Sequence, residues 1–122
     1  MVLDVTEVHR RGTDDALCEE WFVIENRTEL PVSTRGCKIM LVRTGGTKPL
    51  EMAKLDPGFT VSAGGKLRVV CGSPGTKIHG KAPEDGVENY FLCMKAPLLR
   101  WPSGSLRILK GQLALLSADF GA

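Results

Sequence analysis

Cysteine and histidine side chains can act in nucleophilic catalysis and bind metal ions, but their spacing in this chain argues against a catalytic or metal site. These residues stand at Cys18, Cys37, Cys71, Cys93, His9 and His79. Zinc sites present two ligands within a few residues of each other, whereas this chain has no Cys-x-x-Cys pair and neither histidine is close to a cysteine. A nucleophilic cysteine needs a base beside it, and no spacing favours one cysteine–histidine pair over another. We therefore expect no metal, no cofactor and four reduced thiols, mostly buried as small apolar residues.

Two pairs of adjacent acids are the other residues that acid–base catalysis would use. Asp14-Asp15 lies in a polar turn and Glu19-Glu20 lies at the start of an apolar stretch. Solvation by water is the ordinary role of carboxylates at such positions. With no catalytic arrangement of cysteines, histidines or acids in view, we expect that the chain is not an enzyme.

The segment 73–81, Ser-Pro-Gly-Thr-Lys-Ile-His-Gly-Lys, is the strongest candidate for a binding site. It belongs to a predicted loop over residues 72–89, and a loop this long in a compact domain is often functional. Lys77, His79 and Lys81 would suit an anion, which would be a phosphate, a nucleic acid or an acidic protein segment. The alternative is a solvated loop whose charges only maintain solubility, since the spacing is not that of a nucleotide-binding loop.

Charge is distributed unevenly along the chain, although the formal net charge is only +2. Residues 1–30 carry eight acids and three arginines, whereas residues 31–81 carry nine bases and two acids. The two oppositely charged thirds either face each other across a sheet or form a dipolar surface that steers a partner.

The basic middle third is the candidate for a nucleic-acid surface. Lys66 and Arg68 alternate with apolar residues on a predicted half-exposed strand, so both should point outward and extend the basic surface of the loop. Lys38 and Arg43 would join them. Base stacking needs aromatic side chains on the same surface, and most of the seven aromatic residues are needed in the core.

Two further features would suit a protein partner. Trp101, beside Pro102, would be a binding anchor if it is exposed at one end of the fold, and a packing residue otherwise. The first strand, Val2 to Val8, has few protective charges on its apolar side. Its edge would pair with a partner strand or with a second copy, so a homodimer is an alternative to the expected monomer.

Length and composition set the frame for these residues. The chain has 122 residues, of which 43% are hydrophobic and 25% charged, which is typical of one soluble globular domain spanning residues 1–122. No apolar run approaches the roughly 18 residues of a membrane span. Met1 to Val5 lacks the apolar segment of a signal peptide, which predicts an intracellular protein.

Short apolar stretches separated by turn residues predict an all-β fold with seven to nine strands. Fourteen glycines and seven prolines disfavour long helices. The stretch 19–25 is apolar on both faces, so we expect a central strand covered on both sides. The last hairpin is predicted to turn at Lys110-Gly111. Two packed sheets in an immunoglobulin-like sandwich are the favoured architecture, with a closed barrel as the alternative. The other predicted strands or extended stretches are 2–8, 37–43, 50–53, 59–61, 66–71, 90–94, 105–109 and 112–120.

Four motifs follow one another between about residue 2 and residue 120. They are 20–26 (Glu-Trp-Phe-Val-Ile-Glu-Asn), 30–39 (Leu-Pro-Val-Ser-Thr-Arg-Gly-Cys-Lys-Ile), 55–69 (Leu-Asp-Pro-Gly-Phe-Thr-Val-Ser-Ala-Gly-Gly-Lys-Leu-Arg-Val) and 101–109 (Trp-Pro-Ser-Gly-Ser-Leu-Arg-Ile-Leu). Their order and spacing resemble the lamin-tail domain, an immunoglobulin-like β-sandwich. The chain departs from the family at Cys37, where a buried Trp is usual, and at Ser105, where Asp is usual.

The resemblance implies an interaction module without catalytic residues of its own. It leads us to expect a non-catalytic protein-interaction or scaffold module in a cytoskeletal or nuclear setting. A nucleic-acid-binding module that uses the basic middle third is the alternative. The partner-binding residues expected from the sequence are Lys66, Arg68, Lys77, His79, Lys81 and Trp101.

Overall fold

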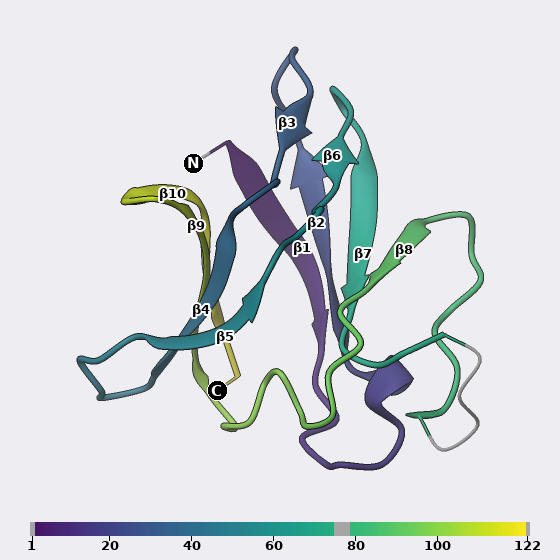
Figure 1. The fold of residues 1–122 in the computed structure, drawn as a ribbon, viewed down its shortest axis with the longest axis vertical. Helices are drawn as coiled ribbons and strands as arrows, with labels where there is room; N and C mark the ends of the chain where they lie inside the picture. Colours follow the sequence, from purple (N-terminus) through teal and green to yellow (C-terminus); the bar gives the residue numbers. More distant parts are fainter. Residues whose placement is uncertain (1, 75–78, 122) are drawn as a thin grey trace.

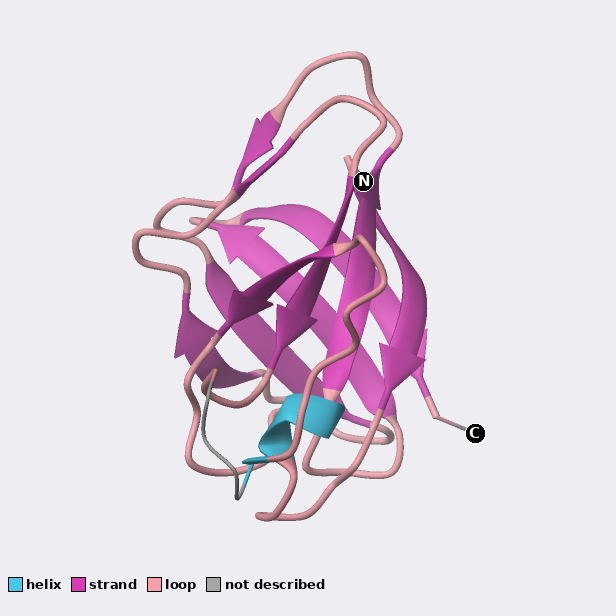
Figure 2. Cartoon of the chain, turned by 90° about the vertical axis from the view of Figure 1, so that its right-hand side faces the viewer, coloured by secondary structure: helices cyan, strands magenta, loops and turns pink. Residues whose placement is uncertain are grey.

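The computed structural model describes residues 2–74 and 79–121, and eight of the ten strands in these residues form two four-stranded sheets (Figures 1 and 2). The first sheet has the order β1-β2-β7-β8, built from Leu3–His9, Trp21–Asn26, Lys66–Val70 and Glu88–Phe91. The second has the order β10-β9-β4-β5, built from Leu113–Phe120, Gly104–Lys110, Lys38–Arg43 and Leu50–Lys54. The predicted all-β sandwich is confirmed.

Two small elements complete the described fold. The strands β3 (Val32–Ser33) and β6 (Thr60–Val61) pair into a short ribbon that extends beyond the sheets in Figure 1. A single 3-10 helical turn, Leu17–Glu19, precedes β2 and is the cyan element of Figure 2. No helix among the described residues has the length and apolar character needed to cross a membrane.

The main core lies between the two sheets because alternate residues of each strand point inward. Phe22, Ile24 and Val69 come from the first sheet, and Ile39 and Ile108 come from the second. Each of these side chains is fully buried. The strand β2 is also covered on its outer face, as its sequence predicted, because Trp21 and Val23 belong to a second apolar cluster with Cys18, Val70 and Ala82.

The two long sides of the sandwich differ. On one side the edge strand β1 lies beside β10, with Cα atoms within 8 Å, so this predicted free edge already has a neighbour in the same chain. On the other side stand β5 and β8, which pair only with β4 and β7 respectively within the described residues. The β7–β8 pairing is parallel, whereas the other strand pairs are antiparallel.

The last hairpin turns one residue later than predicted. Lys110 pairs with Leu113, which makes Gly111 and Gln112 the connecting residues. Gly111 has a φ of 62°, a conformation that glycine adopts without steric cost.

Candidate functional site

The prediction that the Arg68 side chain is exposed to solvent is wrong. Its side chain is buried, with 1% exposure, rather than outward in solvent. The guanidinium donates from Nη2 to Asp85 Oδ2 at 2.6 Å and from Nη1 to Asn89 Oδ1 at 2.8 Å and Pro83 O at 3.2 Å. It also lies 4.7 Å from the ring centre of Trp21, a cation–π contact. The alternation correctly predicted the outer face, but the end of the long loop covers that face.

The remaining predicted lysines that the structure describes are each paired with a carboxylate. Lys66 and Lys81 are exposed, but Lys66 Nζ lies 3.5 Å from Glu25 Oε2 and Lys81 Nζ lies 3.2 Å from Glu84 Oε1. Lys77 falls outside the described residues. Glu25 and Lys66 are register partners on β2 and β7, so here the acidic and basic thirds face each other across a sheet.

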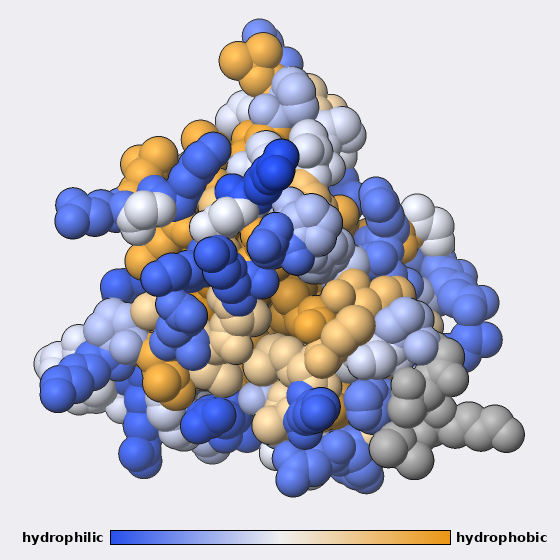
Figure 3. All heavy atoms as spheres, in the orientation of Figure 1, coloured by the Kyte–Doolittle hydropathy of each residue, from blue (hydrophilic) through white to orange (hydrophobic). Residues whose placement is uncertain are grey.

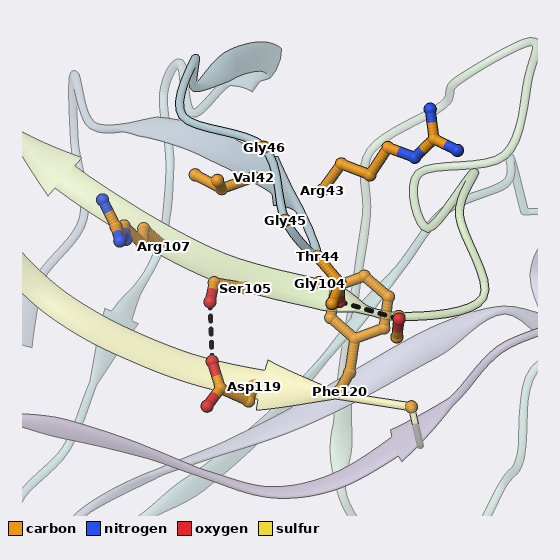
Figure 4. Close-up of a pocket in the computed structure, with 12 residues that line it drawn as sticks. Val42, Arg43, Thr44, Gly45, Gly46, Gly104, Ser105, Arg107, Asp119 and Phe120 are labelled. Atoms are coloured by element: carbon orange, nitrogen blue, oxygen red, sulfur yellow. Dashed lines mark hydrogen bonds between the residues drawn. The ribbon is translucent and has the colours of Figure 1, made fainter.

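Lys38 and Arg43 lie on β4, in the other sheet. Lys38 Nζ is 3.0 Å from Glu51 Oε1, whereas Arg43 stands at the edge of an open hollow of about 420 Å³. Figure 4 shows that Arg43 and Arg107 point away from each other at this hollow, while Ser105 is bonded to Asp119. Two diverging arginines cannot hold one anion together, so the hollow lacks a built anion site.

His79 and Trp101 serve the fold more than the surface. His79 is half-buried and its Nδ1 accepts a hydrogen bond of 3.1 Å from the Ser73 backbone N–H. This contact joins two residues that lie on either side of 75–78 in the long loop. Trp101 is also half-buried and packs against the main core. Trp101 therefore contributes to packing, and part of its side chain remains exposed.

Glu20 differs from the solvated acid that its position predicted. Its side chain has 0% exposure and accepts three backbone hydrogen bonds. Oε1 accepts from Gly12 N at 2.8 Å and Arg11 N at 3.1 Å, and Oε2 accepts from Leu99 N at 3.1 Å. A buried carboxylate that accepts these bonds fixes two loops against β2 and is not exposed to a substrate.

Three of the four cysteines are buried, and Cys93 is exposed. Burial raises the pKa of Cys71 to about 12, and burial also raises the pKa of Cys18 and Cys37. The reactive thiolate is therefore scarce at these three positions near neutral pH. Among residues 2–74 and 79–121, no three or more His, Cys, Asp or Glu side chains are grouped to hold a metal ion.

The side of the sandwich between β5 and β8 carries apolar residues that the sequence analysis did not single out. Six half-buried apolar residues from β5, β8 and the segments beside them pack against the main core there. We call them the β5–β8 strip: Met52, Ala53, Phe59, Tyr90, Leu92 and Met94. Figure 3 shows apolar surface in the middle of this side, with hydrophilic residues around it.

An aromatic pair is the centre of the β5–β8 strip. The rings of Phe59, just before β6, and Tyr90, on β8, lie 4.9 Å apart at an interplanar angle of 56°. This tilted contact is favourable for two aromatic rings and connects segments that come from different parts of the chain. The sequence gives only a weak indication of the β5–β8 strip, because the strip depends on which two strands lie at the open edges of the sheets.

In comparisons with known proteins, no family model matches this sequence and no curated protein matches it.

Proposed function

We propose that this chain is a non-catalytic protein-interaction module that binds an extended segment of a partner protein at the β5–β8 strip. The setting that we propose is intracellular, cytoskeletal or nuclear, as the resemblance to the lamin-tail domain implies. The observation that carries the proposal is a row of partly exposed apolar side chains located between two sheet edges.

The two edges support an extended ligand. In the described part of the chain, β5 and β8 each have one paired neighbour, so the backbone N–H and C=O groups on their outer sides have no strand partner. A partner segment that adds a strand to such an edge gains backbone hydrogen bonds, and its alternate side chains can bury against apolar residues. Met52 on β5 and Tyr90 on β8 offer that apolar contact.

The distribution of charge favours a protein partner over a nucleic acid. Three of the basic residues expected to form the cationic surface are in ion pairs, namely Lys38, Lys66 and Lys81. Arg68 is buried. A nucleic-acid surface would need these cations free and adjacent along a phosphate backbone.

The test begins with the full chain as bait in lysate of its source cells, with and without nuclease. The captured protein is identified, and the affinity of its binding segment is measured with purified components. We expect Tyr90→Ala and Met52→Glu to weaken binding by about tenfold or more, which corresponds to roughly 1.4 kcal/mol of lost contact.

Matched substitutions elsewhere are the controls. Trp101→Ala removes another half-buried aromatic residue, and Leu113→Glu places the same charge at a residue with 64% exposure. Both should bind as the wild type does. Each variant must first match the wild type in its circular dichroism spectrum. Equal losses in all four variants, or capture that disappears with nuclease and falls steeply with salt, would refute the proposal.

A further inference from the structure

Cys18 and Cys93 are distant in sequence but lie on opposite sides of one glycine. The Cys93 backbone N–H donates to Gly72 O at 3.2 Å, and the Gly72 N–H donates to Leu17 O, also at 3.2 Å. A Cβ placed on Gly72 would be 2.8 Å from the Cys18 Sγ. A residue without a side chain is therefore what separates the Cys18 thiol from the Cys93 backbone.

The two cysteines differ in solvent exposure. Cys93 is exposed, and its φ of 57° is uncommon for a residue other than glycine. Cys18 is buried with 2% exposure, and its thiol donates to Ser73 O at 3.1 Å. The pKa of Cys18 is raised, mainly by burial and then by the negative charges of Cys93 and Glu19.

We propose that Cys93 is an oxidation site for hydrogen peroxide and that Cys18 captures the oxidised sulfur in an intramolecular disulfide. In the first step the Cys93 thiolate attacks a peroxide oxygen, the O–O bond breaks, and hydroxide leaves, which gives a sulfenic acid. In the second step the Cys18 sulfur attacks the Cys93 sulfur as the Cys18 thiol loses its proton, the S–O bond breaks, and hydroxide leaves. The two thiol protons convert both hydroxides to water, so two thiols and one peroxide yield one disulfide and two waters.

The neighbouring structure permits the closure. Cys93 follows the four-residue edge strand β8, and the segment beyond Gly72 is the long loop. The strand β8 pairs only with β7 within the described residues, so the backbone movement that brings the sulfurs to bonding geometry falls on an edge of the first sheet.

The test uses the reduced full-length protein treated with hydrogen peroxide and then alkylated under denaturing conditions. We expect two of the four thiols to become unreactive and the protein to remain monomeric with the mass of two hydrogen atoms lost. Peptide mapping without reductant should recover one cross-linked species that joins the Cys18 and Cys93 peptides. A reductant should restore all four thiols.

Substitutions assign the order of the two steps. Cys93→Ser should lose the peroxide reaction, whereas Cys18→Ser or Cys18→Ala should leave a sulfenic acid on Cys93 that dimedone traps. Cys37→Ala, at a buried cysteine of the main core, should still form the disulfide. Intermolecular Cys93 dimers, a sulfinic acid without a disulfide, or no loss of thiols in the wild type would each overturn the proposal. Mapping of the wild type decides this without any variant and without the partner protein.

Discussion

At the scale of single residues, the buried guanidinium of Arg68 is the main departure of the first sheet from the sequence prediction. A buried guanidinium is stable only when its hydrogen-bond donors have acceptors. Asp85, Asn89 and Pro83 supply acceptors to Nη1 and Nη2, while Nε has no partner among the described residues. These bonds fasten the end of the long loop to β7 and cover Trp21. Arg68 is thus a structural clamp.

Replacement of Asp85 should change how stability depends on pH. The hydrogen bond from Arg68, followed by that from the Val87 backbone, lowers the pKa of Asp85. A lowered folded-state pKa adds stability above the unfolded value of about 3.9, and this stability is lost as pH falls through the folded-state pKa. We expect Asp85→Asn to lower the urea midpoint at pH 7, with the difference from the wild type narrowing below about pH 4.

Urea unfolding between neutral pH and pH 3 checks this prediction. Asp14→Asn is the matched control, because Asp14 is exposed and has no hydrogen bond or ion pair within residues 2–74 and 79–121. It should follow the wild type throughout. A constant difference between Asp85→Asn and the wild type across the whole pH range would contradict the role given to the Arg68–Asp85 pair.

At the scale of elements, the antiparallel hairpin β9–β10 depends on the backbone of its turn. Gly111 has a φ of 62°, and a Cβ placed there would meet no atom within 4 Å. The space is open, so only the left-handed conformation opposes a side chain. The hairpin register from Lys110 and Leu113 onward follows from this turn.

Substitution at Gly111 should separate conformational strain from crowding. We expect Gly111→Ala to destabilise the fold by about 1 kcal/mol, since an L-residue in the left-handed region costs about 1–2 kcal/mol. Gly111→Asn should cost less, because asparagine tolerates this region better. Chemical denaturation measures both values. An equal loss for alanine and asparagine would show that the conformation of residue 111 is not the cause.

At the scale of elements, the strands were easier to predict from the sequence than the contacts between distant segments. Alternation and apolar runs were enough to predict β2 as a doubly covered strand, because the pattern is local to residues 21–26. Arg68 was misplaced because alternation shows which face a side chain is on and not whether a distant loop covers that face. The β5–β8 strip was missed for a related reason: Met52 and Tyr90 become neighbours of one open side only through the order of strands in two sheets.

At the scale of the whole molecule, stability comes mainly from the interior between the two sheets. Ile39 and Ile108 are register partners on β4 and β9, and both have 0% exposure. Their side chains face the inner residues of the first sheet across the core. Hydrophobic burial there is the dominant favourable term in folding.

Two substitutions to alanine compare the contribution of the interior to stability with that of a sheet edge. Ile108→Ala should lower the free energy of unfolding by about 2–5 kcal/mol, the range for a buried aliphatic residue that leaves a cavity. Leu50→Ala, at a residue of the β5 edge with 38% exposure, should change it by roughly 0.5 kcal/mol or less. Thermal and urea unfolding provide both numbers. Similar losses at the two positions would mean that the edge contributes as much as the interior.

The parallel pairing of β8 with β7 has a consequence for the order of folding. The chain leaves β7 and must return through residues 71–87 before β8 can pair in the same direction. Closing this long connection has an entropic cost that is incurred before the contacts between β7 and β8 can offset it. The β9–β10 hairpin closes through a short turn, and its entropic cost is smaller. We therefore expect β8 to join last and its amides to exchange with solvent before those of β2. One of the two edge strands that we propose for the partner is therefore also expected to be the last strand to join the first sheet.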